Sequence, residues 1–114
     1  MYRPFLALAG LLGALGVATA AAASHSGDTN LGIAGNFLLF HAPALIGLSL
    51  VPRSRLITIA GFVLAAGLAL FCGNLATRSF AGHALFSMSA PIGGGTLILG
   101  WLLVAATALF TRRT

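Results

Sequence analysis

"LITIAGFVLAAGLALFCGNLA", residues 56–76, contains no charged side chain and is about as long as the apolar segment that a helix needs to cross a bilayer. Three further apolar runs of similar length accompany it. Alternation of apolar and polar residues is absent from all four runs, and a transmembrane barrel needs at least about eight strands. The sequence therefore predicts an all-α integral membrane protein, a single domain over residues 1–114. Its four transmembrane helices are predicted at residues 5–23, 31–51, 56–76 and 90–110.

The composition excludes several classes of protein. Hydrophobic residues make up 59% of the chain and charged residues only 6%, which is far from the usage of a soluble domain. All six basic residues are arginines, scattered between apolar runs rather than clustered with aromatics, so no nucleic-acid partner is expected. Asp28 is the only acid, which leaves acid–base catalysis almost nothing to work with. We therefore predict a protein that is not an enzyme, with no catalytic residues, no metal site and no cofactor.

The arginines also predict the orientation in the membrane. The connections between the runs are short, so neighbouring helices should be antiparallel and form a four-helix bundle of two hairpins. Cytoplasmic connections carry an excess of basic residues. Placing both termini in the cytoplasm leaves only Arg78 on the opposite side. The arginines on the cytoplasmic side would be Arg3, Arg53, Arg55, Arg112 and Arg113.

The first run has a competing interpretation as a secretory signal. It has a basic start, an apolar core and a tail of small residues, as cleaved signals do. The apolar run nevertheless continues to Ala23 rather than stopping at a short core. We therefore expect a retained helix.

Glycines are expected to form the contacts between helices. In lipid, helices associate where small residues let two backbones approach closely. Small residues recur at helical spacing in the first, third and fourth predicted helices. The glycines selected by this pattern are Gly13, Gly16, Gly61, Gly93 and Gly100.

Two asparagines suggest a polar contact between the second and third helices. Asn36 falls on the same side of its helix as Gly32 and Gly47, which is the side expected to meet a neighbour. Asn74 lies at a similar depth on the antiparallel third helix. A pair of side-chain amides between them would contribute about 1 kcal/mol.

His41 stands near the middle of the second helix, in "NFLLFHAPALIGL". An imidazole that faces only hydrocarbon would be costly, so we expect a partner in the same bundle, in a second copy or in another subunit. Pro43 has no N–H to offer the Leu39 carbonyl, which leaves an acceptor nearby. His41, its neighbour Phe40 and Trp101, which lies well inside the fourth helix, are the predicted contacts to a partner or ligand.

Several roles are open to His41. The simplest is a neutral histidine with a structural hydrogen bond. Ligation of haem or a metal, contact with a quinone, and a proton relay are the alternatives. A bis-histidine haem needs a second histidine within the membrane. The other two, His25 and His83, fall in connections, so such a haem would require a homodimer or another subunit.

Ordered motifs along most of the chain resemble a known family. The segments "AAASH", "NFLLFHAPALIGL", "GFVLAAGLALFCGNLA" and "APIGGGTLILGWLLVA" are similar to the small YgdD-like membrane proteins, known as domain of unknown function 423. The pair Phe40–His41 and the pair Gly100–Trp101 are the most specific parts. The resemblance implies a four-helix protein of the bacterial inner membrane, and it implies no activity.

Three classes of function are consistent with these observations. We favour a non-catalytic accessory subunit in the lipid bilayer, a homo-oligomer or part of a larger membrane complex such as a respiratory or redox assembly. A small oligomeric transporter or channel is the second class, with Asn36 and Asn74 lining its path. The third is a membrane electron-transfer component that binds haem or quinone through His41. A bound lipid is compatible with each class.

Overall fold

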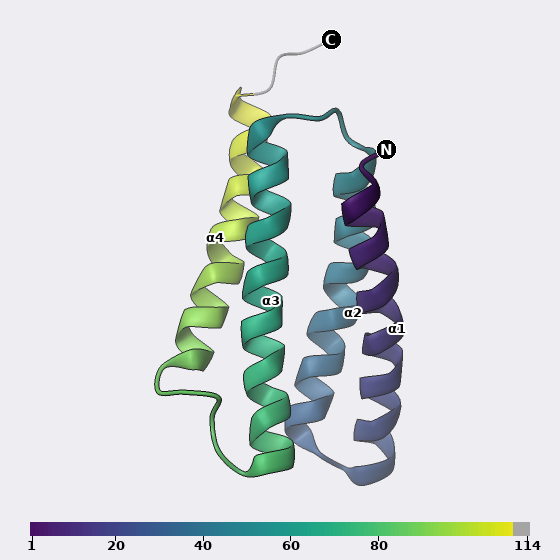
Figure 1. The fold of residues 1–114 in the computed structure, drawn as a ribbon, viewed down its shortest axis with the longest axis vertical. Helices are drawn as coiled ribbons and strands as arrows, with labels where there is room; N and C mark the ends of the chain where they lie inside the picture. The colour runs from purple at the N-terminus through teal and green to yellow at the C-terminus, as the bar shows by residue number, and fades with distance from the viewer. Residues whose placement is uncertain (111–114) are drawn as a thin grey trace.

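The computed structural model describes residues 1–110, and these residues form four long helices (Figure 1). All four are long and apolar enough to cross a membrane, which confirms the predicted all-α class with four candidate spans. Arg112 and Arg113, on which the predicted orientation partly rests, lie outside the described residues. The helices are α1 (Arg3–Ser26), α2 (Thr29–Leu50), α3 (Arg55–Ala81) and α4 (Ser89–Phe110).

Local sequence signals set the helix ends. The side chains of Asp28 and Ser54 cap α2 and α3, each accepting a hydrogen bond from the backbone N–H three residues later. Such caps satisfy amides that have no partner inside the helix. Gly27 and Gly82 follow α1 and α3 with φ of 71° and 80°, a left-handed conformation that glycine adopts without a Cβ clash.

The third helix is longer than its apolar run. The transmembrane segment predicted at residues 56–76 lies inside α3, which continues to Ala81. Apolar length reports only the part of a helix that lies in hydrocarbon, whereas the helix itself continues until a residue can leave the helical conformation. That residue is Gly82.

The helices form two hairpins, α1–α2 and α3–α4, that meet along α2 and α3. Within residues 1–110, α1 and α4 make no extensive contact with each other. The molecule measures 49 × 27 × 17 Å, so the hairpins form a thin, open layer. Figure 1 shows the N-terminus, the α2–α3 connection and the end of α4 together at one end of this layer. We call it the arginine end, after Arg3, Arg53 and Arg55, and the opposite end the Asp28 end.

All five glycines selected from the sequence lie where helices meet. A Cβ built on Gly93 would lie 2.8 Å from the backbone nitrogen of Phe71, and one on Gly100 would lie 2.7 Å from the side chain of Leu64. These approaches hold α3 and α4 together. Gly13 and Gly16 pack against α2, and Gly61 packs against the Phe5 ring of α1. Two glycines that the sequence analysis left out, Gly35 and Gly67, make equally close contacts.

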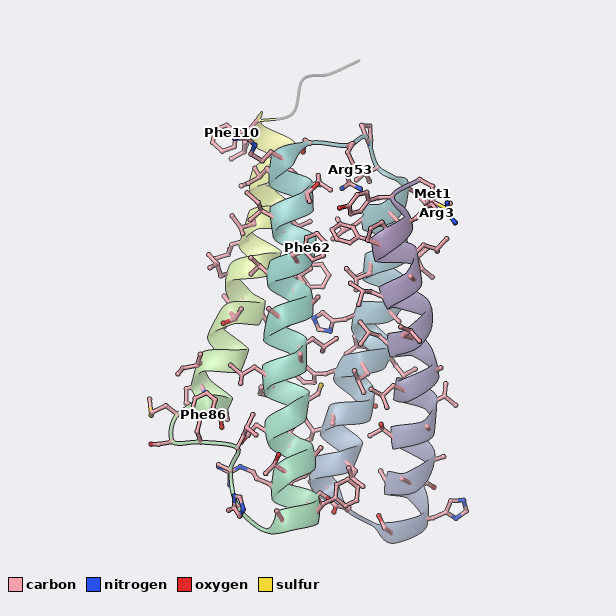
Figure 2. The ribbon with its side chains drawn as sticks, viewed as in Figure 1. Met1, Arg3, Arg53, Phe62, Phe86 and Phe110 are labelled. Atoms are coloured by element: carbon pink, nitrogen blue, oxygen red, sulfur yellow. The ribbon has the colours of Figure 1, made fainter. Side chains whose placement is uncertain are left out.

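An aromatic cluster closes the layer at the arginine end. Phe5 is fully buried, and its ring stands edge-on to Tyr2 and Phe62, with centroids 4.7 and 5.2 Å away. The Arg53 guanidinium carbon lies 4.1 Å from the centroid of the Tyr2 ring. Figure 2 shows Arg53 and Phe62 in the gap between α1 and α3 at this end.

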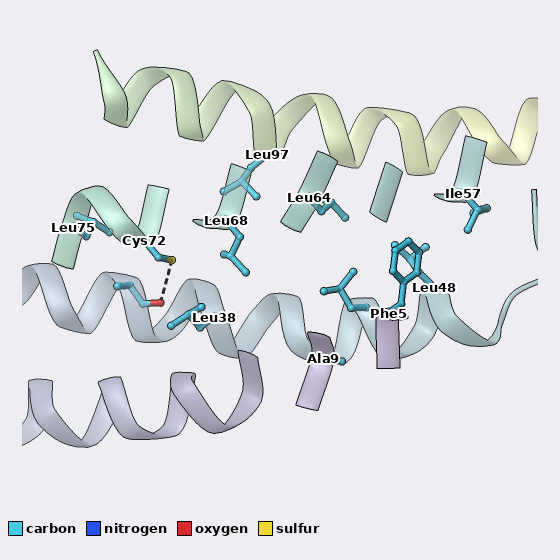
Figure 3. Close-up of a cluster of buried hydrophobic side chains, with 12 residues drawn as sticks. Phe5, Ala9, Leu38, Leu48, Ile57, Leu64, Leu68, Cys72, Leu75 and Leu97 are labelled. Atoms are coloured by element: carbon cyan, nitrogen blue, oxygen red, sulfur yellow. Dashed lines mark hydrogen bonds between the residues drawn. The ribbon is translucent and has the colours of Figure 1, made fainter. Parts of the chain in front are cut away.

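The centre of the layer is a buried apolar cluster drawn from all four helices (Figure 3). Leu38 of α2, Leu64 and Leu68 of α3, and Leu97 of α4 are among its members. Cys72 belongs to it as well, and its thiol lies 3.6 Å from the Ala34 carbonyl oxygen across the α2–α3 contact. The thiol therefore serves as a small packing residue.

Candidate functional site

His41 is buried inside the protomer, with 5% of its surface exposed. One ring nitrogen, Nδ1, lies 2.6 Å from the Phe37 carbonyl oxygen. The other, Nε2, lies 3.1 Å from Nε1 of Trp101. An indole N–H can only donate, so Nε2 must accept and the proton of a neutral ring must be on Nδ1. His41 therefore donates to Phe37 and accepts from Trp101.

This arrangement settles which of the expected partners His41 uses. The partner belongs to the same chain, so a second copy or another subunit is not needed to satisfy the imidazole. The freed Leu39 carbonyl is not its acceptor either, because Nδ1 bonds the carbonyl of Phe37. Haem or metal ligation at Nε2 would first have to break the bond to Trp101. The structure thus supports a structural role for His41 more than a ligand role.

The His41–Trp101 bond also joins helices that are not neighbours in the layer. His41 is on α2 and Trp101 on α4, and α3 lies between these two helices. Among the described residues, α2 and α4 make no other extensive contact. The bond therefore links one hairpin to the other at mid-depth.

Aromatic side chains surround this link and border a shallow pocket of about 280 Å³. The Phe37 ring is 4.6 Å from that of Phe71, centroid to centroid, and the rings of His41 and Trp101 are 5.6 Å apart. Trp101 remains 43% exposed. Phe40, which we predicted as a contact beside His41, does not join the pocket. It is 67% exposed and points away from the bundle.

The predicted amide pair between Asn36 and Asn74 does not form. Asn36 is exposed, whereas Asn74 is completely buried. The Asn74 Oδ1 accepts two hydrogen bonds, from the Leu85 amide at 3.1 Å and from the Ser89 hydroxyl at 2.7 Å. Asn74 therefore holds the α3–α4 connection against α3, and the two asparagines do not line a common polar path.

At the Asp28 end, a polar contact fastens the α1–α2 turn to α3. The Ser79 hydroxyl donates to the carboxylate of Asp28, and the Leu31 backbone N–H donates to its other oxygen. These bonds, with that of Ser79 the more important, lower the pKa of the Asp28 carboxyl below its ordinary value. The sequence analysis did not foresee this contact, because Ser79 lies beyond the predicted end of its helix.

An apolar groove of about 560 Å³ lies between α1 and α3, with α2 as its floor. It runs from Leu8 near the arginine end to Ala22 and Phe80 near the Asp28 end. Its walls are built mainly from small residues. These are Ala18, Thr19 and Ala22 on α1, and Ala65, Ala69, Gly73 and Ala76 on α3.

Metal-binding side chains are dispersed over the described part of the chain. Within residues 1–110, no group of three or more His, Cys, Asp or Glu residues is close enough to hold a metal ion. His25 and His83 lie in or beside the connections, far along the sequence from His41.

Comparisons with known proteins identify the family of this chain. No solved structure matches this chain. The family model described as "Protein of unknown function (DUF423)" matches residues 9–94. The match includes His41, Asn74 and the close-packed Gly93, and it confirms the resemblance found in the sequence. The chain therefore belongs to the DUF423 family.

Proposed function

We propose that this protein is a non-catalytic component of a membrane assembly, joined through the outer face of α1 to a second copy or to a larger complex. We place it in the bacterial inner membrane, with both termini in the cytoplasm, as its arginines favour. A respiratory or other redox complex is one such assembly. Its own residues would contribute packing surface rather than chemistry.

The observation that carries the proposal is a stripe of small side chains on α1 that the protomer leaves uncovered. Gly10, Ala14 and Ala21 recur at intervals of four and seven residues and are all exposed. A Cβ built on Gly10 would meet no other atom within 4 Å. Such stripes let a second transmembrane helix approach closely. The stripe that packs α1 on α2 is a different one, which includes Gly13 and Gly16.

The burial of the four helices agrees with this role. Only 17% of the most apolar part of α1 is buried inside the protomer, against 44% for α2. As an edge helix, α1 has one side free along its length. His41 does not carry the proposal, because its hydrogen bonds are satisfied within the chain.

The test compares two glycines that have equally free space around them in the protomer. Gly10 of α1 and Gly95 of α4 are both exposed, and neither has an atom within 4 Å of a built Cβ. The protein is purified in mild detergent, and its mass is measured by light scattering coupled to size exclusion. We expect a wild-type particle larger than the 11.5 kDa chain, which Gly10→Leu reduces and Gly95→Leu leaves intact.

Two results would contradict the proposal. One is a monodisperse wild-type monomer from which no other protein co-purifies. The other is an assembly that Gly10→Leu and Gly95→Leu leave equally intact, because contact through the α1 stripe requires a difference between them.

A further inference from the structure

The groove between α1 and α3 offers an occupant mainly apolar surface. Two of its lining residues have polar side-chain atoms, and these atoms already have partners in the protomer. The Thr19 hydroxyl donates to the Leu15 carbonyl at 2.7 Å, and the Cys72 thiol is directed to the Ala34 carbonyl. A molecule that fills the groove therefore has to be hydrocarbon along its length.

The groove is long enough for an extended chain. It extends on α1 from Leu8 to Ala22, which is about 20 Å at 1.5 Å per residue. Its volume is about 560 Å³. An extended hydrocarbon chain matches this length and the apolar lining.

One end of the groove is cationic. The Phe5 ring fills the gap between α1 and α3 beside Gly61, and the groove begins about one turn further along. The Arg53 guanidinium carbon lies 5.2 Å from the centroid of this ring (Figure 2). Arg3 and Arg55 belong to the same end, whereas Asp28, the only acid in the sequence, lies at the other end and is bonded to Ser79.

From this geometry we propose that the groove binds an anionic phospholipid of the surrounding bilayer. One acyl chain lies between α1 and α3, and the phosphate lies at Arg53. A leaflet's hydrocarbon is about 15 Å thick, so a groove of about 20 Å accommodates an acyl chain from the leaflet at the arginine end. The chain enters the groove from its open, lipid-facing side, because the Phe5 ring fills the gap between α1 and α3 at that end. Anionic headgroups are attracted to arginines at the membrane surface. The lipid covers a face of α1 different from the stripe at Gly10 and Ala14.

The test is native mass spectrometry of the full-length protein, released from detergent after mixing with phosphatidylglycerol or phosphatidylcholine of identical chains. We expect phosphatidylglycerol to bind about five-fold more strongly, the effect of about one arginine near the surface. Arg53→Gln should remove the preference, and Arg53→Lys should keep it. Arg78→Gln, which changes an exposed arginine at the Asp28 end, is the matched control and should keep the preference.

A second pair of variants tests the acyl chain. Ala69→Phe fills the groove and should reduce binding of both lipids, whereas Ala105→Phe, at an exposed alanine of α4, should not. Circular dichroism and thermal unfolding identify any variant that loses the fold. Equal binding of the two lipids to the wild type would overturn the proposal, as would a preference that survives Arg53→Gln. The proposal would also be overturned if Ala69→Phe changed the mass of the particle but not its lipid binding. That result would mean that a second copy of the protein fills the groove.

Discussion

Replacing Trp101 by phenylalanine removes the indole N–H that reaches His41 and keeps an aromatic ring in its place. The Nε2 atom of His41, on a side chain only 5% exposed, would then lack a donor. A buried acceptor left without its partner costs about 1–3 kcal/mol. Within membranes, interhelical hydrogen bonds measured by double-mutant cycles average about 0.6 kcal/mol and reach about 1.7 kcal/mol. We expect a single-variant loss in the first range and a coupling energy in the second.

The coupling energy requires four proteins: wild type, Trp101→Phe, His41→Leu and the double variant. Unfolding is driven by adding sodium dodecyl sulfate to mixed micelles and followed by far-ultraviolet circular dichroism. Fluorescence cannot serve, because Trp101 is the only tryptophan in the chain. Phe40→Leu is the control for a change beside His41, since Phe40 is 67% exposed and should leave stability unchanged.

The cycle can refute the interpretation directly. Two residues that do not interact give a coupling energy below about 0.3–0.5 kcal/mol in such a cycle. A value that small would mean that the His41–Trp101 bond does not join the hairpins. A larger value supports the link, because α2 and α4 make no other extensive contact among the described residues.

Three further predictions use paired positions or pH. Asn74→Ala should destabilise the protein by about 1–3 kcal/mol and speed hydrogen exchange in the α3–α4 connection, whereas Asn36→Ala should change neither, since Asn36 is exposed. Gly93→Ala should lower the free energy of unfolding by about 1–3 kcal/mol through overpacking. Gly95 has open space around it, so Gly95→Ala should raise the free energy of unfolding by up to about 1 kcal/mol through helix propensity. Unfolding in mixed micelles measures both changes. The pKa of the Asp28 carboxyl is lowered in the folded protein. Its contribution to the stability of the fold is therefore complete above the ordinary pKa of about 3.9 and is lost as pH falls through the pKa of the folded state. Asp28→Asn should therefore lower stability at neutral pH and flatten its decrease in acid, which a pH series of the same unfolding experiment would reveal.

The sequence was enough to predict the number of helices and many of their contacts. A membrane span has a minimum length set by the bilayer, so four apolar runs were sufficient to count the helices. Small residues at helical spacing identified the contacts at Gly93 and Gly100, because only small side chains permit such approach. The last turn of α3 lies beyond the apolar run, because residues 77–79 are polar yet still helical.

The faces of α2 could not be predicted for a physical reason. In a soluble helix the apolar side faces the core, but in a membrane the lipid-facing side is apolar too, and the periodic contrast fades. The middle helix α2 also packs against both α1 and α3. Asn36 was therefore assigned to a contact face when it is exposed, and Gly35, which contacts Ala20 of α1, was overlooked.

The sequence also did not reveal which residues meet when they are far apart along the chain. His41 and Trp101 are 60 residues apart, and nothing in their local sequences indicates that they meet. Arg53 and Tyr2 likewise meet although they are far apart in the sequence. Such pairs depend on how two hairpins dock, which apolar periodicity does not encode.

Most of the arginines have no counter-charge among the side chains of this protein. His41 and the Asn74 oxygen have partners within the protomer, whereas the Asn74 amide nitrogen, Nδ2, is buried without one among the described residues. The arginines differ, because one carboxylate cannot neutralise six of them, and Asp28 lies at the end opposite Arg3, Arg53 and Arg55. Counter-charge for these three must come from outside the side chains of this protein. In a bilayer the nearest anions are lipid phosphates, and the phosphate of the lipid proposed at Arg53 would supply part of this counter-charge.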